Sequence, residues 1–223
     1  MASNTSHERC YTFLGKNVEY STALPFPHLV VDAFLTPETI HSLNKEWPGE
    51  WLVKEGRTSV KKSLQKNLPS SASQLVESLY SEQSCKMIGN ALGVKNLLPD
   101  PYWHSKGEIF GGGLHDIPSG GFLKMHVDFN MHPTGLQRCA NLLIYLNETW
   151  KKEWGGELVL GDKKKVMPIA GRAVLFGTTE DSWHGHPEPL NTPKGISRRS
   201  LALYYYTEAK VVAPHTTIYR SKK

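Results

Sequence analysis

Hydrophobic and polar positions alternate in short runs through the second half of the chain, and turn-forming residues separate the runs. Eight runs follow one another without helical spacing between them: EIFGGGLHDI, GFLKMHVD, CANLLIYLN, GELVLG, KVMPI, RAVLFG, SWHGH and RSLALYYYT. Many short, evenly spaced strands are typical of a double-sheet jelly roll. The pattern therefore predicts a β core over residues 101–210.

The first hundred residues follow a helical pattern instead. Thr36 and Pro37 mark the start of an amphipathic helix, and apolar residues recur at helical intervals over residues 71–92. Ser81 or Ser84 is the expected break within that second segment, which then forms two helices.

A short apolar run of strand length, HLVVDAF, precedes the first helix, whereas residues 50–70 predict either a hairpin or a mobile loop. Residues 1–24 show no periodicity and are expected to form a tail. Together these patterns predict one α+β domain over residues 1–223, with mainly helical support over residues 1–100 and a double-sheet jelly-roll core over residues 101–210.

Composition narrows the class of protein. The 223 residues suffice for one domain, and 39% hydrophobic and 21% charged residues are ordinary for a globular protein. No run approaches the roughly 18 apolar residues of a membrane helix, and MASNTSHERCYTF lacks the apolar segment of a secretion signal. The three cysteines have no zinc spacing and no disulfide framework. We therefore expect a cytoplasmic protein; the sequence does not indicate its oligomeric state.

The basic balance of the chain changes this picture little. A net charge of +5 predicts mild attraction to anions. No nucleic-acid-binding motif accompanies it, so the nucleic-acid signal is weak. The basic residues between Lys54 and Lys66 predict either a segment that closes over an anionic substrate or a solvated surface.

The stretch GGFLKMHVDFN carries the first candidate chemistry. On a strand, His126 and Asp128 project to the same side, and an imidazole with a carboxylate forms two-thirds of a facial triad for iron(II). SWHGHPEP supplies two candidates for the third ligand, His184 and His186. His184 lies 58 residues after His126, which suits two strands that face each other across a barrel.

The run RRSLALYYYT offers a cation that could bind the carboxylate of a small molecule. Arg198 and Arg199 are both candidates, because the planar guanidinium matches a carboxylate bidentately. By alternation, Arg198 shares a face with Ser200, whose hydroxyl can add a hydrogen bond.

The motifs HxD, YLNxxWxxxxGGEL, SWHG and RxSLALYYY, in this order, resemble the iron(II)- and 2-oxoglutarate-dependent oxygenases, and within them the prolyl-4-hydroxylase-like group. The resemblance covers about residues 105–207. It implies a double-stranded β-helix (jelly-roll or cupin-like) core with Fe(2+) held by His126, Asp128 and His184, and with 2-oxoglutarate and O2 as co-substrates. It also implies that Arg198 and Ser200 bind the distal carboxylate of 2-oxoglutarate.

RCANLLIYLNETW is similar to a stretch of the oxygen-sensing prolyl hydroxylases, in which a tyrosine at the position of Tyr145 binds the same carboxylate. Asn141 shares the face of Tyr145 and is expected to reach the co-substrate or a metal ligand. Many relatives place their cation where Lys194 lies, so Lys194 is an alternative to Arg198. His115 and Trp183 are candidates for orienting the metal ligands.

Two further features bear on the reaction. The tyrosine that some prolyl hydroxylases carry just before HxD is absent, which weakens the case for a peptidyl-proline substrate. Asp128 favours hydroxylation over halogenation, because related halogenases replace this carboxylate with a small residue.

The resemblance therefore predicts a dioxygenase that hydroxylates an unactivated C–H bond of a small metabolite or amino acid and releases succinate and CO2. One alternative is a prolyl (or other residue) hydroxylase that acts on a peptide or protein. Another, from a different class, is a non-catalytic jelly-roll binding module.

Overall fold

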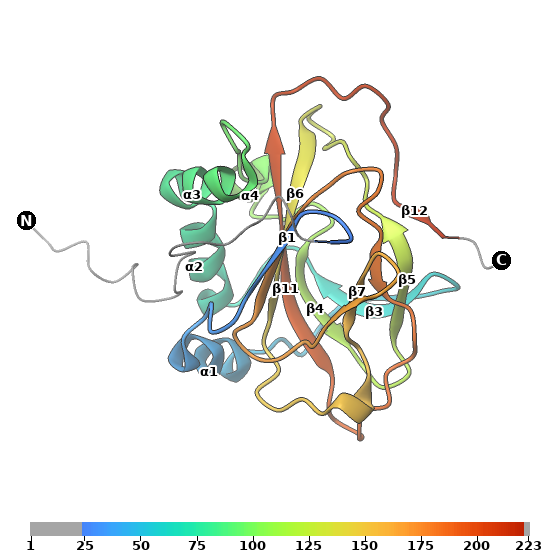
Figure 1. Ribbon diagram of the computed structural model, residues 1–223. Coiled ribbons are helices and arrows are strands. Elements are labelled where there is room, and N and C mark those ends of the chain that lie inside the picture. Colours follow the sequence, from blue (N-terminus) through green and yellow to red (C-terminus); the bar gives the residue numbers. More distant parts are fainter. Residues whose placement is uncertain (1–23, 221–223) are drawn as a thin grey trace, which may run out of the picture.

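The computed structural model describes residues 24–220, so the predicted tail lies almost wholly outside the described residues. Four helices cover one side of a body built from strands (Figure 1). They are α1 (Pro37–Lys45), α2 (Ser70–Leu79), α3 (Glu82–Leu92) and α4 (Pro101–Lys106). None of the described helices is long and apolar enough to cross a membrane.

Capping residues set the helix ends as the sequence predicts. The Thr36 hydroxyl accepts a hydrogen bond from the Thr39 amide at the start of α1. Ser81 caps α3 in the same way through the Ser84 amide, so the predicted break at Ser81 is confirmed. Gly93 ends α3 with a φ of 69°, a left-handed conformation that favours glycine.

Each of the eight predicted strand runs overlaps a strand of the structure. They are β4 (Gly113–Ile117), β5 (Phe122–Val127), β6 (Gln137–Tyr145), β7 (Leu158–Leu160), β8 (Lys164–Val166), β9 (Ala173–Gly177), β10 (His184–His186) and β11 (Arg198–Thr207). A short 3-10 helix, η1 (Lys152–Trp154), precedes β7.

Strands from both ends of the chain complete the sheet. β1 (His28–Val31) pairs with β9, and the hairpin of β2 (Leu52–Glu55) and β3 (Ser59–Leu64) joins through β3 to β4 and β5. Of the two expectations for residues 50–70, the hairpin is therefore confirmed. β12 (Ile218–Tyr219) pairs with β5, so the sheet extends beyond the core predicted to end at residue 210.

The strand order is β1-β9-β6-β11-β4-β3-β5-β10-β7-β8, and the paired strands named in this order are antiparallel. Such a curled, mostly antiparallel sheet with helices on one side is consistent with a double-stranded β-helix, as the sequence predicts. The order places β5 beside β10, although 58 residues separate the start of β10 from His126 on β5.

Alternation along β11 separates the core from the candidate site. Leu201, Leu203 and Tyr205 belong to the core cluster that the helices share, and the Tyr205 hydroxyl donates to the carbonyl of Leu79 on α2. Arg198 and Ser200 line a cavity on the opposite face of the strand. Because successive side chains of a strand point to opposite faces, burying one set against the helices directs the other into the cavity.

Candidate metal centre and co-substrate pocket

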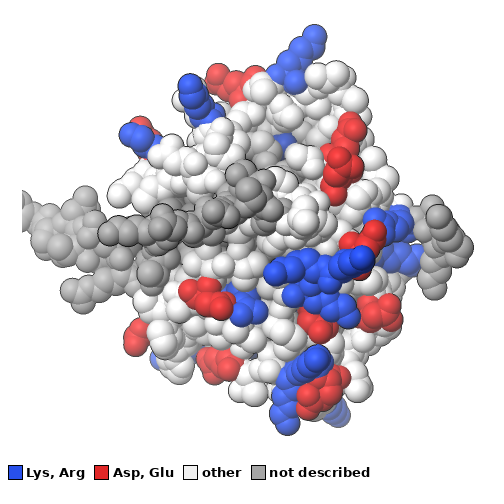
Figure 2. Space-filling model, viewed as in Figure 1, with Lys and Arg blue, Asp and Glu red and all other residues white. Residues whose placement is uncertain are grey.

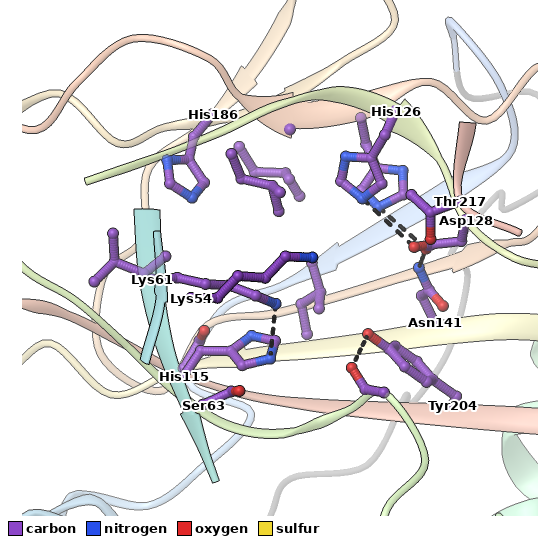
Figure 3. Close-up of a pocket in the computed structure, with 18 of the residues that line it drawn as sticks. Lys54, Lys61, Ser63, His115, His126, Asp128, Asn141, His186, Tyr204 and Thr217 are labelled. Carbon is purple, nitrogen blue, oxygen red and sulfur yellow. Dashed lines mark hydrogen bonds and ion pairs between the residues drawn. The ribbon is translucent and has the colours of Figure 1, made fainter. Parts of the chain in front are cut away.

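His126, Asp128 and His184 lie together at one wall of this cavity. Figure 3 shows His126 beside Asp128. Their candidate ligand atoms all lie within 4.8 Å of one another, and all three residues are buried. Nε2 of His126 is 3.4 Å from Oδ1 of Asp128, and Nε2 of His184 is 3.2 Å from Oδ2. Three such atoms converging from one side match the facial arrangement that iron(II) takes in oxygenases.

The two histidines are neighbours within the sheet. His184 is the register partner of His126 in the antiparallel β5–β10 pair, and their ring centroids are 4.3 Å apart. The expectation that their strands face each other across a barrel is therefore wrong. Direct pairing of the strands fixes the separation of the two imidazoles through backbone hydrogen bonds.

Backbone carbonyls fix the tautomer of both imidazoles. Nδ1 of His126 lies 2.8 Å from the Lys124 carbonyl, and Nδ1 of His184 lies 2.8 Å from the Ser182 carbonyl. A carbonyl oxygen only accepts, so each Nδ1 carries the proton and each Nε2 keeps a lone pair facing the metal position. Burial and the neighbouring His184 also lower the pKa of His126, which favours the neutral ring that binds metals.

Asp128 is held ionised by two neighbours. Its Oδ2 accepts hydrogen bonds from Nδ2 of Asn141 at 2.6 Å and from Nη2 of Arg138 at 2.9 Å. Burial alone would raise the pKa of Asp128, but the Arg138 guanidinium holds it well below its usual range. The two neutral imidazoles and one carboxylate therefore fit a divalent iron ion.

Arg138 is a residue of this site that the sequence did not single out. It is fully buried on β6, and its guanidinium carbon lies 3.4 Å from the centroid of the Tyr204 ring and 4.3 Å from that of Phe129. Its Nε also donates to Oδ1 of Asn141 at 3.1 Å. The available signal was an arginine at the start of an apolar strand run, a position where a charge must be paired if buried.

Arg198 forms a second polar centre in the cavity. Its Nε donates to the Gly156 carbonyl at 2.8 Å, and its Nη2 lies 3.3 Å from the Tyr145 hydroxyl. Within residues 24–220 no carboxylate lies at ion-pair distance from Arg198, although burial lowers its pKa. A buried guanidinium without a carboxylate partner fits an incoming carboxylate, and Ser200 lines the same cavity.

The adjacent Arg199 shows the opposite environment. It donates to Oδ1 of Asn44 at 3.0 Å and lies over the Trp47 ring, outside the cavity. Its Nε is 3.9 Å from Oδ2 of Asp116. Alternation along β11 thus favours Arg198 over Arg199 as the co-substrate cation.

The remaining predicted residues fall into different places. Asn141 lines the cavity and contacts Asp128, the second of its two expected roles. Lys194 is exposed on the loop before β11. His115 lines the cavity, but its recorded side-chain partner is Nζ of Lys61 at 3.4 Å. The Trp183 ring lies under Arg220, 4.9 Å from its guanidinium carbon.

The cavity has a volume of about 340 Å³ and draws on segments from across the chain. The β2–β3 hairpin supplies Lys54 and Lys61, and the C-terminal segment supplies Thr217 and Tyr219. The ring of Tyr219 lies 5.6 Å from that of its register partner His126. The basic cluster over Lys54–Lys66 marked the two lysines in the sequence, whereas no motif marks Thr217 and Tyr219, because their place depends on how distant segments pair.

Comparison with known proteins gives a family and a fold. Residues 112–206 match the model of the 2OG-Fe(II) oxygenase superfamily. A Pseudomonas putida prolyl-4-hydroxylase is similar in structure, with a TM-score of 0.58 and 21% identity over 82% of this chain and 93% of that chain.

Two further structures have the same fold. A prolyl hydroxylase from Trichoplax adhaerens, in complex with a peptide fragment of the hypoxia inducible factor oxygen degradation domain, gives a TM-score of 0.56 and 19% identity over 80% of this chain and 83% of that chain. HygX from Streptomyces hygroscopicus, with nickel, 2-oxoglutarate and hygromycin B bound, gives a TM-score of 0.54 and 12% identity over 81% of this chain and 83% of that chain.

No curated protein matches the sequence significantly. The family match covers the cavity-lining strands β4, β5, β6, β10 and β11, and it includes the three candidate metal ligands and Arg198. Residues 112–206 are therefore similar to the 2OG-Fe(II) oxygenase superfamily, and the chain has the fold of prolyl-4-hydroxylase-like oxygenases. Both findings support an iron(II)- and 2-oxoglutarate-dependent dioxygenase.

Proposed function

We propose that this dioxygenase hydroxylates an unactivated C–H bond of a small metabolite or amino acid, with His126, Asp128 and His184 as the iron ligands. The observation that carries the metal assignment is the convergence of two Nε2 atoms and one carboxylate, each oriented by its own hydrogen bonds. Iron(II) with 2-oxoglutarate supplies the oxidising power when bound, and succinate and CO2 are released.

Arg198, Tyr145 and Ser200 are proposed to hold the distal carboxylate of 2-oxoglutarate. The Arg198 guanidinium keeps donor capacity directed into the cavity, since its described bonds use Nε and Nη2. Tyr145 is fully buried, and burial raises its pKa, so its hydroxyl stays protonated and able to donate. Asn141 acts by orienting Asp128 rather than by touching the co-substrate.

The cavity favours a small substrate. Its volume of about 340 Å³ lies near the lower end of the range for small-molecule pockets, which is roughly 300–1,000 Å³. A prolyl or other residue of a peptide is the second candidate, supported by the likeness in fold to the peptide-bound enzyme from Trichoplax adhaerens.

Spectroscopy without oxygen tests the metal and co-substrate assignments. Adding iron(II) and 2-oxoglutarate to the purified protein should produce the weak visible band of the chelate. Asp128→Ala and His126→Ala should abolish the band, whereas His104→Ala, which replaces an exposed histidine on α4, should retain it. A band of parental intensity in both ligand variants would refute the assignment.

A second assay identifies the substrate class. Succinate formation is measured with a metabolite library in one arm and with proline-containing peptides in the other. Stimulation by a metabolite supports the small-molecule proposal, and stimulation by peptides alone would replace it with the peptide alternative.

A further inference from the structure

Two lysines of the β2–β3 hairpin project into the cavity. Lys54 on β2 and Lys61 on β3 are register partners in the antiparallel pair, and both line the same cavity as the metal ligands. Figure 3 shows both side chains extending across the cavity from the hairpin, between His115 and the histidine–aspartate cluster. The lysines therefore face the space left for the substrate.

Stability does not explain this pair. Like charges directly opposite on neighbouring strands are destabilising. Within residues 24–220 no carboxylate lies at ion-pair distance from either ammonium group. Among residues 24–220, Asp128 is the single acidic residue that lines the cavity, and it already accepts hydrogen bonds from Arg138 and Asn141. The two cations therefore lack a balancing anion within the described part of the protein.

The remaining polar groups nearby add hydrogen-bonding capacity without adding negative charge. Nζ of Lys61 lies 3.4 Å from Nε2 of His115. His186 is buried and lines the cavity, and neither of its ring nitrogens has a hydrogen-bond partner among residues 24–220. Buried polar groups are normally satisfied, so unpartnered nitrogens beside two unpaired ammonium groups indicate a site for a polar ligand.

Binding of 2-oxoglutarate does not supply an anionic partner for Lys54 and Lys61. In the proposed function, one carboxylate of 2-oxoglutarate pairs with Arg198 and the other end of the molecule faces the metal ligands. Both of its charges are then compensated without Lys54 or Lys61. The hairpin cations consequently remain available to a second molecule.

We propose that the cavity binds an anionic substrate, whose carboxylate or phosphate group lies between Lys54 and Lys61. This inference rests on the proposed oxygenase function and narrows it to acidic small molecules. Lys54 is exposed, whereas Lys61 is half-buried, so water screens the Lys61 ammonium less than that of an exposed lysine and strengthens its attraction for an anion.

The hairpin itself offers a matched control. Lys62 follows Lys61 directly, so its side chain points to the opposite face of β3, and it does not line the cavity. Its register partners are Val53 and Asp116. Lys62→Met thus removes the same charge from the same strand outside the proposed subsite.

Chemical labelling tests the subsite directly. Pyridoxal 5′-phosphate, an anionic aldehyde, followed by borohydride, marks reactive lysines that lie in anion sites, and peptide mass spectrometry locates them. We expect Lys61 to react at least about tenfold faster than Lys62, and Lys54→Met to slow labelling of Lys61 by about tenfold, which corresponds to about 1.4 kcal/mol. Lys62→Met should leave the rate at Lys61 unchanged within about twofold.

Competing anions identify the preferred group. Sulfate and acetate are compared as protecting agents at constant ionic strength, with chloride as the reference. Stronger protection by sulfate indicates a phosphate-type substrate, and stronger protection by acetate indicates a carboxylate.

Two outcomes would overturn the proposal. One is labelling of Lys61 and Lys62 at equal rates. The other is a Lys61→Met variant that raises the 2-oxoglutarate concentration needed for the visible band as much as Arg198→Ala does, which would assign Lys61 to the co-substrate. Labelling requires neither iron nor oxygen, so selective labelling without any visible band would refute the oxygenase assignment and leave the anion site standing.

Discussion

Two walls of one cavity differ in how their charged side chains are paired. At the metal wall, Asp128 accepts hydrogen bonds from Arg138 and Asn141. At the hairpin wall, Lys54 and Lys61 oppose each other without a carboxylate. Charges of both signs lie interspersed on the outer face shown in Figure 2, so the uneven balance is a property of the cavity rather than of that surface.

This difference indicates that the metal wall is preorganised by the protein, whereas the charges of the hairpin wall are left to be paired by a ligand. A metal-binding carboxylate must hold its orientation before the ion arrives, and hydrogen bonds from neighbouring groups provide that orientation. An anion-binding cation must instead leave its donors free, because a built-in carboxylate would compete with the ligand. Predictions that alter one wall at a time test the distinction.

The largest effect is expected at the metal wall. Asp128→Ala should lower iron(II) affinity by more than about 100-fold, because even a residue that only orients a ligand is worth 10- to 100-fold. Equilibrium titration with iron(II) under anaerobic conditions measures it. His104→Ala serves as the control, and parental affinity in Asp128→Ala would remove this residue from the metal site.

Replacing Arg198, the proposed partner of the distal carboxylate of 2-oxoglutarate, should have the next largest effect. Arg198→Ala should raise the 2-oxoglutarate concentration needed for half-maximal succinate formation by about 100-fold, since loss of a buried charge partner costs roughly 2–5 kcal/mol. Arg199→Ala is the matched control, because that side chain lies on the outer face of β11. An equal rise in both variants would contradict the assignment.

Asn141→Ala separates two roles. If Asn141 orients Asp128, iron(II) affinity should fall by at least about tenfold while the 2-oxoglutarate requirement at saturating iron changes little. Both constants come from the same anaerobic titrations. A raised 2-oxoglutarate requirement with parental iron affinity would instead show that Asn141 contacts the co-substrate.

The hairpin wall should respond to pH. Burial and the neighbouring Lys54 lower the pKa of Lys61 to about 8, so its ammonium is charged below pH 8 and neutral above it. The sulfate concentration that half-protects Lys61 should therefore rise by up to about tenfold between pH 7 and pH 9. The charged or titratable groups facing this ammonium are Lys54, His115, Asp128, Arg138 and His186. Half-protection at the same sulfate concentration across this range would contradict the prediction.

The smallest expected effect is on stability, where the Lys61→Met substitution should improve the protein rather than impair it. Lys61→Met removes a like-charge pair across two strands, which costs roughly 0.2–1 kcal/mol. We expect the free energy of unfolding to rise by about that amount in urea titrations, whereas Lys62→Met should stay within about 0.5 kcal/mol of the parent. A less stable Lys61→Met protein would mean that Lys61 supports the fold.

Local patterns in the sequence predicted much of the structure. Alternation in RRSLALYYYT correctly placed Arg198 and Ser200 on one face and Arg199 on the other. Cap residues set helix boundaries such as Ser81. These features follow from the chemistry of neighbouring residues, so they are readable without knowledge of the fold.

Other features depended on contacts between distant segments. Arg138 reaches Asp128 ten residues earlier in the chain, and Tyr219 approaches His126 because β12 pairs with β5. The prediction that the strands of His126 and His184 face each other across a barrel was wrong, because strand order is set by how all the strands pack together.

The sequence by itself determined the set of candidate ligands, the period-two faces of the strands and the helix caps, because each is fixed by residues close together in the chain. Only the tertiary structure decided which charges are paired. Lys61 and Lys62 are adjacent and chemically identical, yet one faces the cavity and the other does not. Strand pairing sets the surroundings of each lysine side chain, and those surroundings determine whether its charge is paired within the protein or is left for a ligand.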